Sequence, residues 1–302
     1  MEFIRPDTNI DFVGKRRYAL LGSLILILAG IVSLVLHGGP RYGIDFAGGT
    51  LVQVKFNRPV EFKELREVLR EVGFGDAILQ PFGGRGEFLI RMKKTTGELR
   101  GVSAKIEEAF KRRFGEESFE IRRVEMVGPK VGRDLRVKGL KAIIFALIGI
   151  LIYISWRFEF RFAVGAVAAL VHDVLVTVGM FSLTDKEISL PVVAALLTIV
   201  GYSLNDTIVV YDRIRENMRR VRGQLEEIIN RSINETLSRT ILTSLTTLIV
   251  VVVLFALGGG IIRDFAFALI VGVVVGTYSS VYIASPLVIS LERTKRGRGK
   301  RG

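Results

Sequence analysis

Residues 200–217, VGYSLNDTIVVYDRIREN, combine apolar and charged residues within one helix-length stretch. The stretch begins inside a long apolar run, yet it carries a carboxyl group at Asp206 before it reaches the charged residues Asp212 and Arg213. Burying a carboxylate is costly in a soluble core and costlier in a bilayer. The interpretation of Asp206 therefore depends on which solvent surrounds this run.

Long apolar runs lie on both sides of this stretch. Including its own run there are six, at residues 18–36, 139–156, 162–183, 189–212, 240–258 and 264–288. A helix needs about 17 to 25 apolar residues to cross roughly 30 Å of hydrocarbon, and every run falls within this range. Six such runs predict a polytopic α-helical membrane protein with six transmembrane helices, the first at 18–36.

The basic residues indicate how the chain crosses the membrane. The net charge is +13, and Lys and Arg are concentrated in alternate connections. Nineteen of them lie in 1–17, 157–161, 213–239 and 293–302, whereas the short connections 184–188 and 259–263 hold two. Positive loops stay in the cytoplasm, so we expect a multi-pass protein of the cytoplasmic membrane with both termini cytoplasmic. The charge therefore indicates topology, and we expect no nucleic-acid partner.

Residues 1–17 form a cytoplasmic N-terminal segment in this topology. Lys15, Arg16 and Arg17 before an apolar run also fit a cleaved signal peptide, but the run 18–36 is longer than a usual signal core. The sequence that follows, LHGGP, lacks a small-x-small cleavage pattern, so we expect an uncleaved first span. The chain has no cysteine, which excludes disulfides and thiolate metal sites.

Residues 37–138, between the first two spans, are patterned as a separate small domain. Four stretches are rich in β-branched and aromatic residues, which is typical of strands: 49–56, 77–82, 86–93 and 117–128. Residues 60–73 and 97–115 have apolar residues at helical spacing, and Gly83-Gly84-Arg85 fits a hairpin. The order β-α-β-β-α-β predicts a ferredoxin-like α+β domain outside the membrane.

Residues 139–288 are expected to form a five-helix transmembrane bundle that includes a cytoplasmic amphipathic helix at 214–238. Apolar residues recur there every three or four positions, on a stretch rich in Arg and Glu. Such a helix fits the inner membrane surface or a partner protein, and the sequence does not separate the two. A basic cytoplasmic tail follows at 289–302, and its stretch 293–302 is expected to be disordered and attracted to anionic lipid.

Ionisable residues inside the spans are the candidate functional residues, because each costs roughly 2.5–3.5 kcal/mol at the centre of a bilayer. His172 and Asp173 lie in the third span, Asp206 in the fourth, and Arg239 at the start of the fifth. Antiparallel packing of the fourth and fifth spans could bring Arg239 towards Asp206. The pair could be structural, joined by nearby hydroxyl groups. Alternatively, Asp206 could exchange a proton whose affinity changes with conformation.

Several motifs of known chemistry are absent from the sequence. There is no G-x-x-x-x-G-K-[ST] phosphate loop, no H-E-x-x-H and no G-x-S-x-G elbow, and His37 and His172 are the only histidines. We therefore expect no enzyme activity, no cofactor and no metal site. Work by this protein would have to be driven by the membrane gradient, at about 2.3 kcal/mol per charge per 100 mV.

The stretch 200–217 resembles the signature of the SecF subunits of the SecD/SecF protein-export family. Four other segments are similar to that family in the same order: IDFVGKRR (10–17), YGIDFAGGT (42–50), VHDV (171–174) and SRTILTSLTTL (238–248). The glycine-rich segment alone is not specific, because the sister SecD subunits are similar there. The resemblance extends over nearly the whole chain.

The resemblance implies six spans, a ferredoxin-like outer domain and membership of the resistance-nodulation-division superfamily. It implies SecD as the partner, in a twelve-span assembly that uses the proton motive force to pull an unfolded exported polypeptide outwards from a SecYE-type translocation channel. By position, Asp206 is similar to the family's proton-relay carboxylate and Arg239 to its basic partner. The other polar residues of the spans are expected to support this relay: Asn205, His172, Asp173 and Thr243.

Gly43, Gly48 and Gly49 are hinge candidates, because glycines beside a membrane exit suit a bent segment that transmits motion to the outer domain. Two other functions remain open at this point. One is a half-subunit of a proton-driven lipid or small-molecule exporter of the same superfamily. The other is a purely structural subunit that stabilises the channel, in which Asp206 only joins helices. The sequence does not indicate substrate contacts within 57–136, or whether protons or sodium ions are used.

Overall fold

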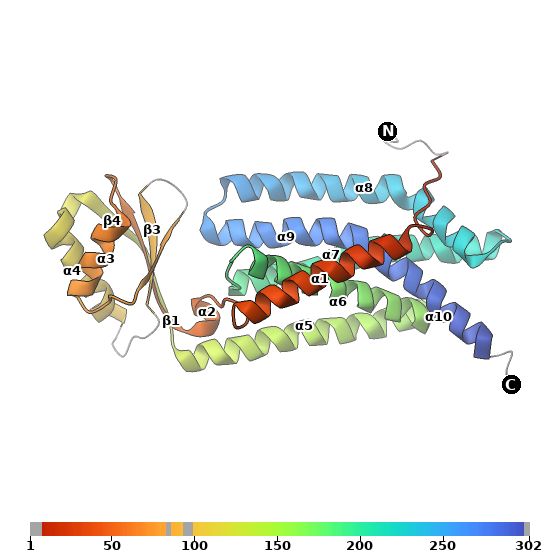
Figure 1. Cartoon of the computed structure of the whole chain (residues 1–302), viewed down its shortest axis with the longest axis horizontal. Coiled ribbons are helices and arrows are strands. Elements are labelled where there is room, and N and C mark those ends of the chain that lie inside the picture. Colours follow the sequence, from red (N-terminus) through yellow and green to blue (C-terminus); the bar gives the residue numbers. More distant parts are fainter. Residues whose placement is uncertain (1–7, 83–85, 93–98, 299–302) are drawn as a thin grey trace.

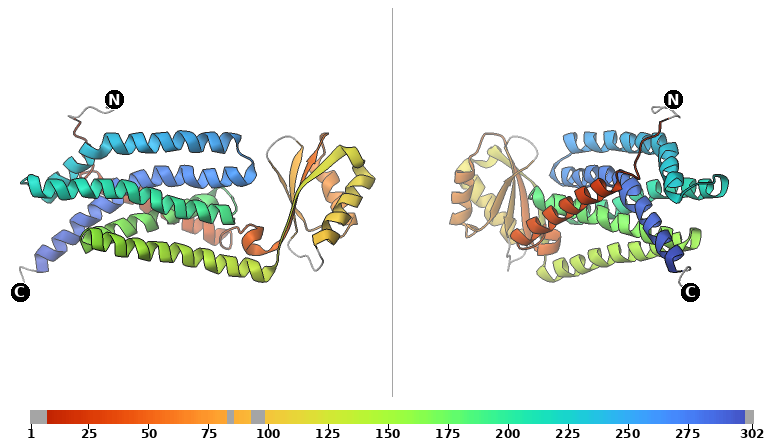
Figure 2. Two further views of the ribbon diagram at one scale, coloured as in Figure 1. Left: turned by 180° about the vertical axis from the view of Figure 1, so that it is seen from behind. Right: turned by 45° about the vertical axis from the view of Figure 1, so that its right-hand side comes forward.

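The computed structural model describes residues 8–82, 86–92 and 99–298. The molecule consists of a bundle of long helices with a small sheet domain at one end of it (Figure 1). Both ends of the chain lie at the opposite end of the bundle in every view (Figure 2).

Six helical segments of the described chain are long and apolar enough to cross a membrane. They are α1 (Arg16–Leu36), α5 (Pro129–Arg157), α6 (Phe160–Leu183), α7 (Leu190–Arg220), α8 (Leu225–Leu257) and α9 (Gly260–Ser279), the last continuing through a π-helical turn (Ser280–Ala284) into α10 (Ser285–Arg298). This confirms the predicted fold class, a polytopic helical membrane protein with a small α+β domain.

The outer domain has the predicted order of elements. These are β1 (Gly49–Phe56), α3 (Phe62–Glu71), β2 (Ile78–Pro81), β3 (Glu87–Met92), α4 (Leu99–Phe114), a 3₁₀ turn (Glu116–Ser118) and β4 (Phe119–Val127). The strands form one antiparallel sheet in the order β2-β3-β1-β4, which is the ferredoxin-like arrangement. The hairpin expected at 83–85 lies outside the described residues.

Strand periodicity explains how the sheet is oriented. In β1, Val52 and Val54 are fully buried together with Ile90 of β3, and they pack against α3 and α4. The alternate residues of β1 point to the other face, which is turned towards the end of the helix bundle (Figure 1). This sheet face is therefore uncovered by the domain's own helices and is turned towards the membrane part, where Leu51 and Leu89 are nevertheless buried.

The helices of the bundle differ in how much protein surrounds them. About half of the most apolar stretch of α6 and of α7 is buried inside the protein. In α1, α5 and α8 the buried share of that stretch is 17% or less. A helix that is apolar on all sides and yet exposed needs lipid or another protein around it. The bundle therefore has an inner group of α6, α7 and α9 and an outer group of α1, α5 and α8.

The single amphipathic helix predicted at 214–238 is wrong. The structure ends α7 at Arg220 and begins α8 at Leu225, so the stretch forms a helical hairpin. Its apolar stripe, including Ile214, Ile229 and Ile233, is buried in a core between helices and does not rest on a membrane surface. The error arose because the same three-and-four spacing continues on both sides of the turn, where Gly223 interrupts the helix.

The tail also differs from the expectation of disorder. Helix α10 continues to Arg298, and residues 299–302 lie outside the described part of the chain. The backbone stays helical because, between Pro286 and Gly297, the sequence contains neither glycine nor proline and is rich in Leu, Lys, Arg and Glu.

Candidate functional site

A buried polar network joins three helices around Asp206 of α7. The side chain of Asp206 is 3% exposed, and the Ser244 hydroxyl of α8 lies 3.5 Å from its Oδ2. Ser244 Oγ lies 2.6 Å from Thr277 Oγ1 of α9. A carboxyl group, a serine and a threonine from three different helices therefore form one chain of polar contacts inside the apolar bundle.

A second buried network lies beside the first, around Asp173 of α6. This carboxyl group is fully buried, and its Oδ2 accepts hydrogen bonds from Ser203 Oγ of α7 at 2.6 Å and from Ser279 Oγ of α9 at 2.8 Å. The Nδ1 atom of His172 lies 3.0 Å from its Oδ1. Asp173 thus ties α6 to α7 and α9, two of the three helices that carry the first network.

The two networks are linked through α7 and α9. Ser203 lies three residues before Asp206 on α7, and Ser279 lies two residues after Thr277 on α9. The helices approach closely here: a Cβ atom added at Gly276 would lie 2.9 Å from the Cβ of Ser203. A shift of α9 against α7 would therefore disturb both carboxyl groups at once.

The helix that contributes Thr277 and Ser279 changes geometry immediately after them. Residues Ser280–Ala284 form a π-helical turn, a feature that often occurs at functional sites. Such a turn leaves carbonyl groups without their usual partners. Tyr211 Oη of α7 donates a hydrogen bond to the carbonyl of Ala284 at 3.2 Å, and Ser285 Oγ donates one to the carbonyl of Ser280 at 2.8 Å.

The predicted relay residues differ in how far they are buried and in whether they contact Asp206. Arg239 is exposed and, within the described residues, forms no ion pair with Asp206, although it is close enough to interact with it electrostatically. Asn205 is exposed, while Thr243 donates to the carbonyls of Arg239 and Thr240 on its own helix. Of the predicted set, Asp206, His172 and Asp173 are buried.

Sequence reasoning missed the hydroxyl partners of the two carboxyl groups, namely Ser203, Ser244, Thr277 and Ser279. The available signal was the presence of Ser and Thr in otherwise apolar runs. Choosing Thr243 rather than Ser244 on α8 amounts to an error of one residue. One residue is a rotation of about 100° on a helix, and the sequence alone does not fix how a helix is rotated in its bundle.

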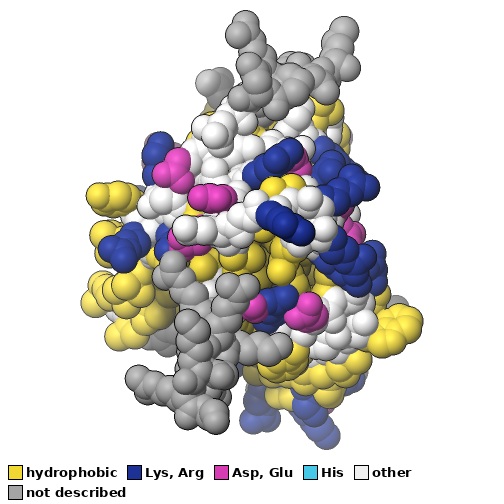
Figure 3. All heavy atoms as spheres, turned by 90° about the vertical axis from the view of Figure 1, so that its right-hand side faces the viewer, with side chains coloured by type: hydrophobic (Ala, Val, Ile, Leu, Met, Phe, Trp, Pro, Cys, Tyr) yellow, Lys and Arg dark blue, Asp and Glu magenta, His cyan; other side chains and the backbone are white. Residues whose placement is uncertain are grey.

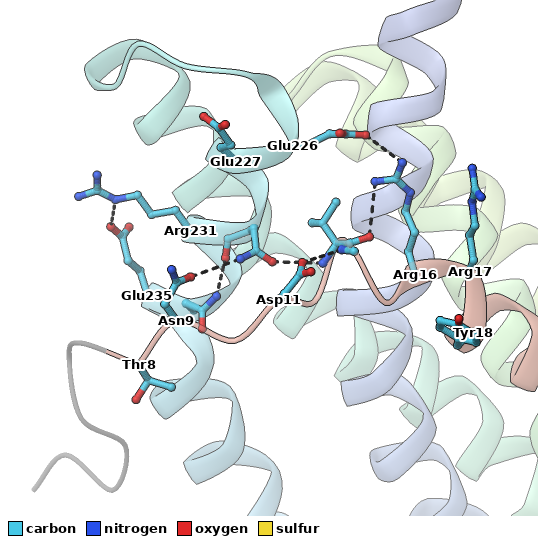
Figure 4. A pocket seen from close by; sticks show the side chains of 14 residues that line it. Thr8, Asn9, Asp11, Arg16, Arg17, Tyr18, Glu226, Glu227, Arg231 and Glu235 are labelled. Carbon is cyan, nitrogen blue, oxygen red and sulfur yellow. Dashed lines mark hydrogen bonds and ion pairs between the residues drawn. The ribbon is translucent and has the colours of Figure 1, made fainter.

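The N-terminal segment is bound to the start of α8 (Figure 4), at the end of the bundle that lies far from the outer domain (Figure 1). Asn230 Oδ1 accepts from the backbone amides of Phe12 and Val13, at 2.9 and 3.1 Å, and its Nδ2 donates to the carbonyl of Ile10 at 3.0 Å. Arg16 pairs with Glu226 at 2.9 Å, as the figure shows. The IDFVGKRR segment therefore ties the start of α1 to the first turns of α8, while α1 itself packs against α6.

The hinge candidates lie where the chain enters the outer domain. Gly48 and Gly49 have φ of 74° and 132°, which favours glycine, whereas Gly43 has ordinary extended geometry. A Cβ at Gly48 would lie 3.0 Å from the Cα of Pro129, and one at Gly132 would lie 3.0 Å from the amide nitrogen of Gly48. The chain segments that enter and leave the domain therefore touch at these glycines.

The outer domain also contacts the loop between α6 and α7. Arg91 of β3 forms an ion pair with Glu187, and both side chains are largely buried. Burial, followed by the nearby charge of Arg41, lowers the pKa of Arg91 to about 10. Arg91 therefore remains protonated near neutral pH, and the contact is ionic.

No group of three or more His, Cys, Asp or Glu residues that could hold a metal ion occurs in the described ranges. The two buried carboxyl groups instead have hydroxyl groups and one imidazole as partners. These groups can donate hydrogen bonds to a carboxylate, and the hydroxyls can also accept one from a carboxylic acid. The arrangement is chemically suited to either protonation state.

Comparison with known families relates this chain to protein export. Residues 105–294 match the family described as protein export membrane protein SecD/SecF, C-terminal, and residues 34–60 match the SecD/SecF GG motif. The protein translocase subunit SecF of Magnetococcus marinus is 51% identical over 98% of this chain and 96% of its own length. The subunit of the same name from Escherichia coli O157:H7 is 40% identical over 93% of this chain and 87% of its own length.

Two solved structures have the same fold. SecDF from Thermus thermophilus, described as a translocon-associated membrane protein, is 40% identical with a TM-score of 0.86, over 96% of this chain. A SecDF structure in a super-membrane-facing form is 39% identical with a TM-score of 0.70, over 98% of this chain. This chain spans 40% of the length of either SecDF chain.

Proposed function

This chain belongs to the SecD/SecF protein-export family as one of its SecF subunits, and on that premise we propose that it couples proton movement across the membrane to the export of polypeptides. The observation that carries the proposal is the buried carboxyl group of Asp206. Within the described residues it has hydroxyl partners on α8 and α9 and no cation at ion-pair distance.

The coupling follows from the contacts of Asp206. A buried carboxylate without a paired cation is unfavourable in a bilayer, so gaining a proton relieves that cost. A protonated carboxyl group donates a hydrogen bond, whereas a carboxylate only accepts them. Each proton transfer therefore changes the preferred orientation of Ser244 and Thr277 and the spacing of α7, α8 and α9.

The energy available is adequate for such a change. A charge that crosses the membrane releases about 2.3 kcal/mol per 100 mV. One interhelical hydrogen bond in a membrane contributes on average about 0.6 kcal/mol and at most about 1.7 kcal/mol. A single proton can therefore drive rearrangement of several such contacts.

The partner we propose is SecD, which would supply the other half of a twelve-span assembly beside a SecYE-type channel. An exposed stripe of small and polar residues runs along α7 at helical spacing: Ala194, Thr198, Gly201 and Asn205. Small residues allow transmembrane helices to pack closely, and exposed polar groups at this depth need a protein neighbour. Arg239, also exposed, would then meet its partner in the assembly rather than in this chain alone.

We place the protein in the cytoplasmic membrane with both termini in the cytoplasm and the outer domain outside. The distribution of basic residues supports this orientation. Its role is that of an accessory subunit without catalysis of its own. Labelling of single introduced cysteines from either side of the membrane tests the orientation, since the native chain has none.

The substitution Asp206→Asn tests the coupling. Asparagine keeps the size of the side chain and its hydrogen bonding but does not titrate. In sealed vesicles that contain the assembled complex, we expect the stimulation of export by a proton gradient to be lost while copurification with SecD is unchanged.

Asp212→Asn is the matched control, because Asp212 is on the same helix but lies at the surface, 3.3 Å from Arg157. Its export should stay at the level of the unchanged protein. Gradient-stimulated export that persists in Asp206→Asn would contradict proton coupling at this site and leave a purely structural role.

A further inference from the structure

We propose that an arginine-lined cavity between α5, α6 and α7 binds the phosphate-bearing headgroup of an anionic phospholipid. The cavity has a volume of about 370 Å³ and lies at the end of the bundle far from the outer domain. Its walls include Trp156 and Arg157 at the end of α5, Arg161 of α6, and Arg215 and Arg219 of α7. The site takes no part in the relay around Asp206.

The charges in the cavity are not balanced. Four arginines line it against one glutamate. Arg157 and Arg161 each have a carboxylate within 3.3 Å. Within the described residues Arg215 and Arg219 form no ion pair, and the one polar contact of Arg215 is to the carbonyl of Arg157 at 3.4 Å. Two guanidinium groups therefore line the cavity without a counter-charge.

Guanidinium groups suit a phosphate better than other anions of the membrane surface. Their planar donors match phosphate oxygens, and pairs of them bind such an anion in a bidentate manner. Lys and Arg side chains gather over this end of the molecule, where apolar side chains also show between them (Figure 3). Basic pockets between transmembrane helices at this depth are suited to acidic headgroups.

The surface beside the cavity indicates that the phosphate belongs to a lipid. Trp156 is 86% exposed, at the position where tryptophan marks a membrane interface. Phe145, Ile148 and Ile152 precede it on α5 at spacings of three and four, and all are exposed. They form one apolar stripe that ends at the cavity. An acyl chain can lie along this stripe while its headgroup reaches the arginines, whereas a soluble phosphate would leave the stripe unused.

The chain offers a direct readout, because Trp156 is its only tryptophan. The full chain is placed in phosphatidylcholine vesicles that contain either bromine-labelled phosphatidylglycerol or bromine-labelled phosphatidylcholine at equal mole fraction. Bromine quenches tryptophan fluorescence on contact. We expect phosphatidylglycerol to quench Trp156 with about twenty- to thirtyfold higher affinity than phosphatidylcholine, since each of the two unpaired arginines is worth roughly fivefold in binding. Equal quenching by the two lipids would overturn the proposal.

The double substitution Arg215→Gln/Arg219→Gln should reduce this preference by about twenty- to thirtyfold at roughly fivefold per arginine. Arg222→Gln is the matched control, because Arg222 is an exposed arginine of the same surface that does not line the cavity. It should leave the preference unchanged. A loss in the control as large as in the double variant would mean that overall surface charge attracts the lipid, which would also overturn the site.

Competition with inorganic phosphate distinguishes a lipid headgroup from a soluble anion as the occupant of the cavity. Millimolar phosphate should leave the preference for phosphatidylglycerol intact if the occupant is a lipid. Abolition of the preference by phosphate would assign the cavity to a soluble anion and contradict the lipid assignment. None of these measurements depends on export, so their failure and the failure of proton coupling are separate results.

Discussion

Asp173 is the residue whose contacts extend furthest through the bundle. It bonds α6 to α7 through Ser203 and to α9 through Ser279, and it lies beside His172. These contacts fix the two helices that present Asp206 and Thr277. The role we infer is therefore one of positioning, in which Asp173 sets the geometry of the relay without exchanging the proton itself.

Substitution of Asp173 tests this role at the residue scale. Asp173→Ala removes the hydrogen bonds of this carboxyl group with Ser203, Ser279 and His172. At about 0.6 kcal/mol or more per bond, we expect the free energy of unfolding to fall by roughly 2 kcal/mol. It should also reduce gradient-stimulated export. Asp173→Asn should retain most of both properties, because an amide oxygen can accept from both serines while the amide nitrogen donates to His172.

Thermal unfolding in detergent and export in sealed vesicles measure the two effects. Ser33→Ala is a suitable control, since it removes a 2.8 Å hydroxyl contact between α1 and α6 that lies outside both networks. If Asp173→Asn abolished export as fully as Asp206→Asn while the complex remained assembled, Asp173 would be a second titrating group and not a positioning residue.

The burial of the two carboxyl groups could be predicted from the sequence, whereas their hydrogen-bond partners could not. An acid in an apolar run signals a protein-facing position from the energetics of the bilayer alone. Whether Arg239 reaches Asp206, or whether Ser244 or Thr243 faces it, depends on the axial shift and rotation of α8 against α7. Those are set by packing over the whole bundle, which no local pattern contains.

Among the elements, α9 controls the spacing of the network. Gly272 and Gly276 let it approach α7, where Cβ atoms would meet Ile199 and Ser203 at 2.3 and 2.9 Å. We expect Gly276→Ala to push the two helices apart and to cost roughly 1–3 kcal/mol, the usual effect of overpacking. Thermal unfolding measures the cost, and gradient-stimulated export should fall with it.

Gly149→Ala on α5 provides the comparison for this substitution. A Cβ at Gly149 would have no neighbour within 4 Å, so alanine should be neutral or slightly stabilising through its higher helix propensity. Equal stability of both variants, with normal export, would show that the close approach of α9 to α7 is not needed for the relay.

The elements themselves could be predicted where their patterns are local. Apolar length gave the six spans, and period-two and helical spacing gave the order of the outer domain, because both signals reside in consecutive residues. The hairpin between α7 and α8 could not be found in this way. Ile214 and Ile229 lie in one core although a turn separates them, so the sequence period looks unbroken.

For the whole molecule, the proposed coupling requires that changes among the spans reach the outer domain. Several connections exist among the described residues, the contact of Phe82 with Gly260 at the start of α9 included, and two of them matter most here. One is the neck of Gly48 and Gly132, which is covalently continuous with β1 and α5. The other is the ion pair of Arg91 with Glu187, which joins the uncovered sheet face to the loop that leads into α7. Because α7 carries Asp206, this loop is the shorter route from the relay to the outer domain.

Charge reversal tests the second connection. Arg91→Glu or Glu187→Arg alone places like charges together in a largely buried site, and breaking such a pair is strongly destabilising. We expect hydrogen exchange of the segment Lys186–Ile188 to increase at least about tenfold, the factor for roughly 1.4 kcal/mol. Export should fall while assembly with SecD persists.

The double variant Arg91→Glu/Glu187→Arg restores opposite charges and should return both measurements towards those of the unchanged protein. The recovery separates the ion pair from any general damage that either substitution does to the outer domain. Export that is normal in the single variants, despite faster exchange at the loop, would mean that motion does not reach the outer domain through this ion pair and would favour the glycine neck. In that case Gly48→Ala would be the variant that blocks the motion. It places alanine at a φ of 74°, which only glycine adopts readily, and brings its Cβ to 3.0 Å from the Cα of Pro129.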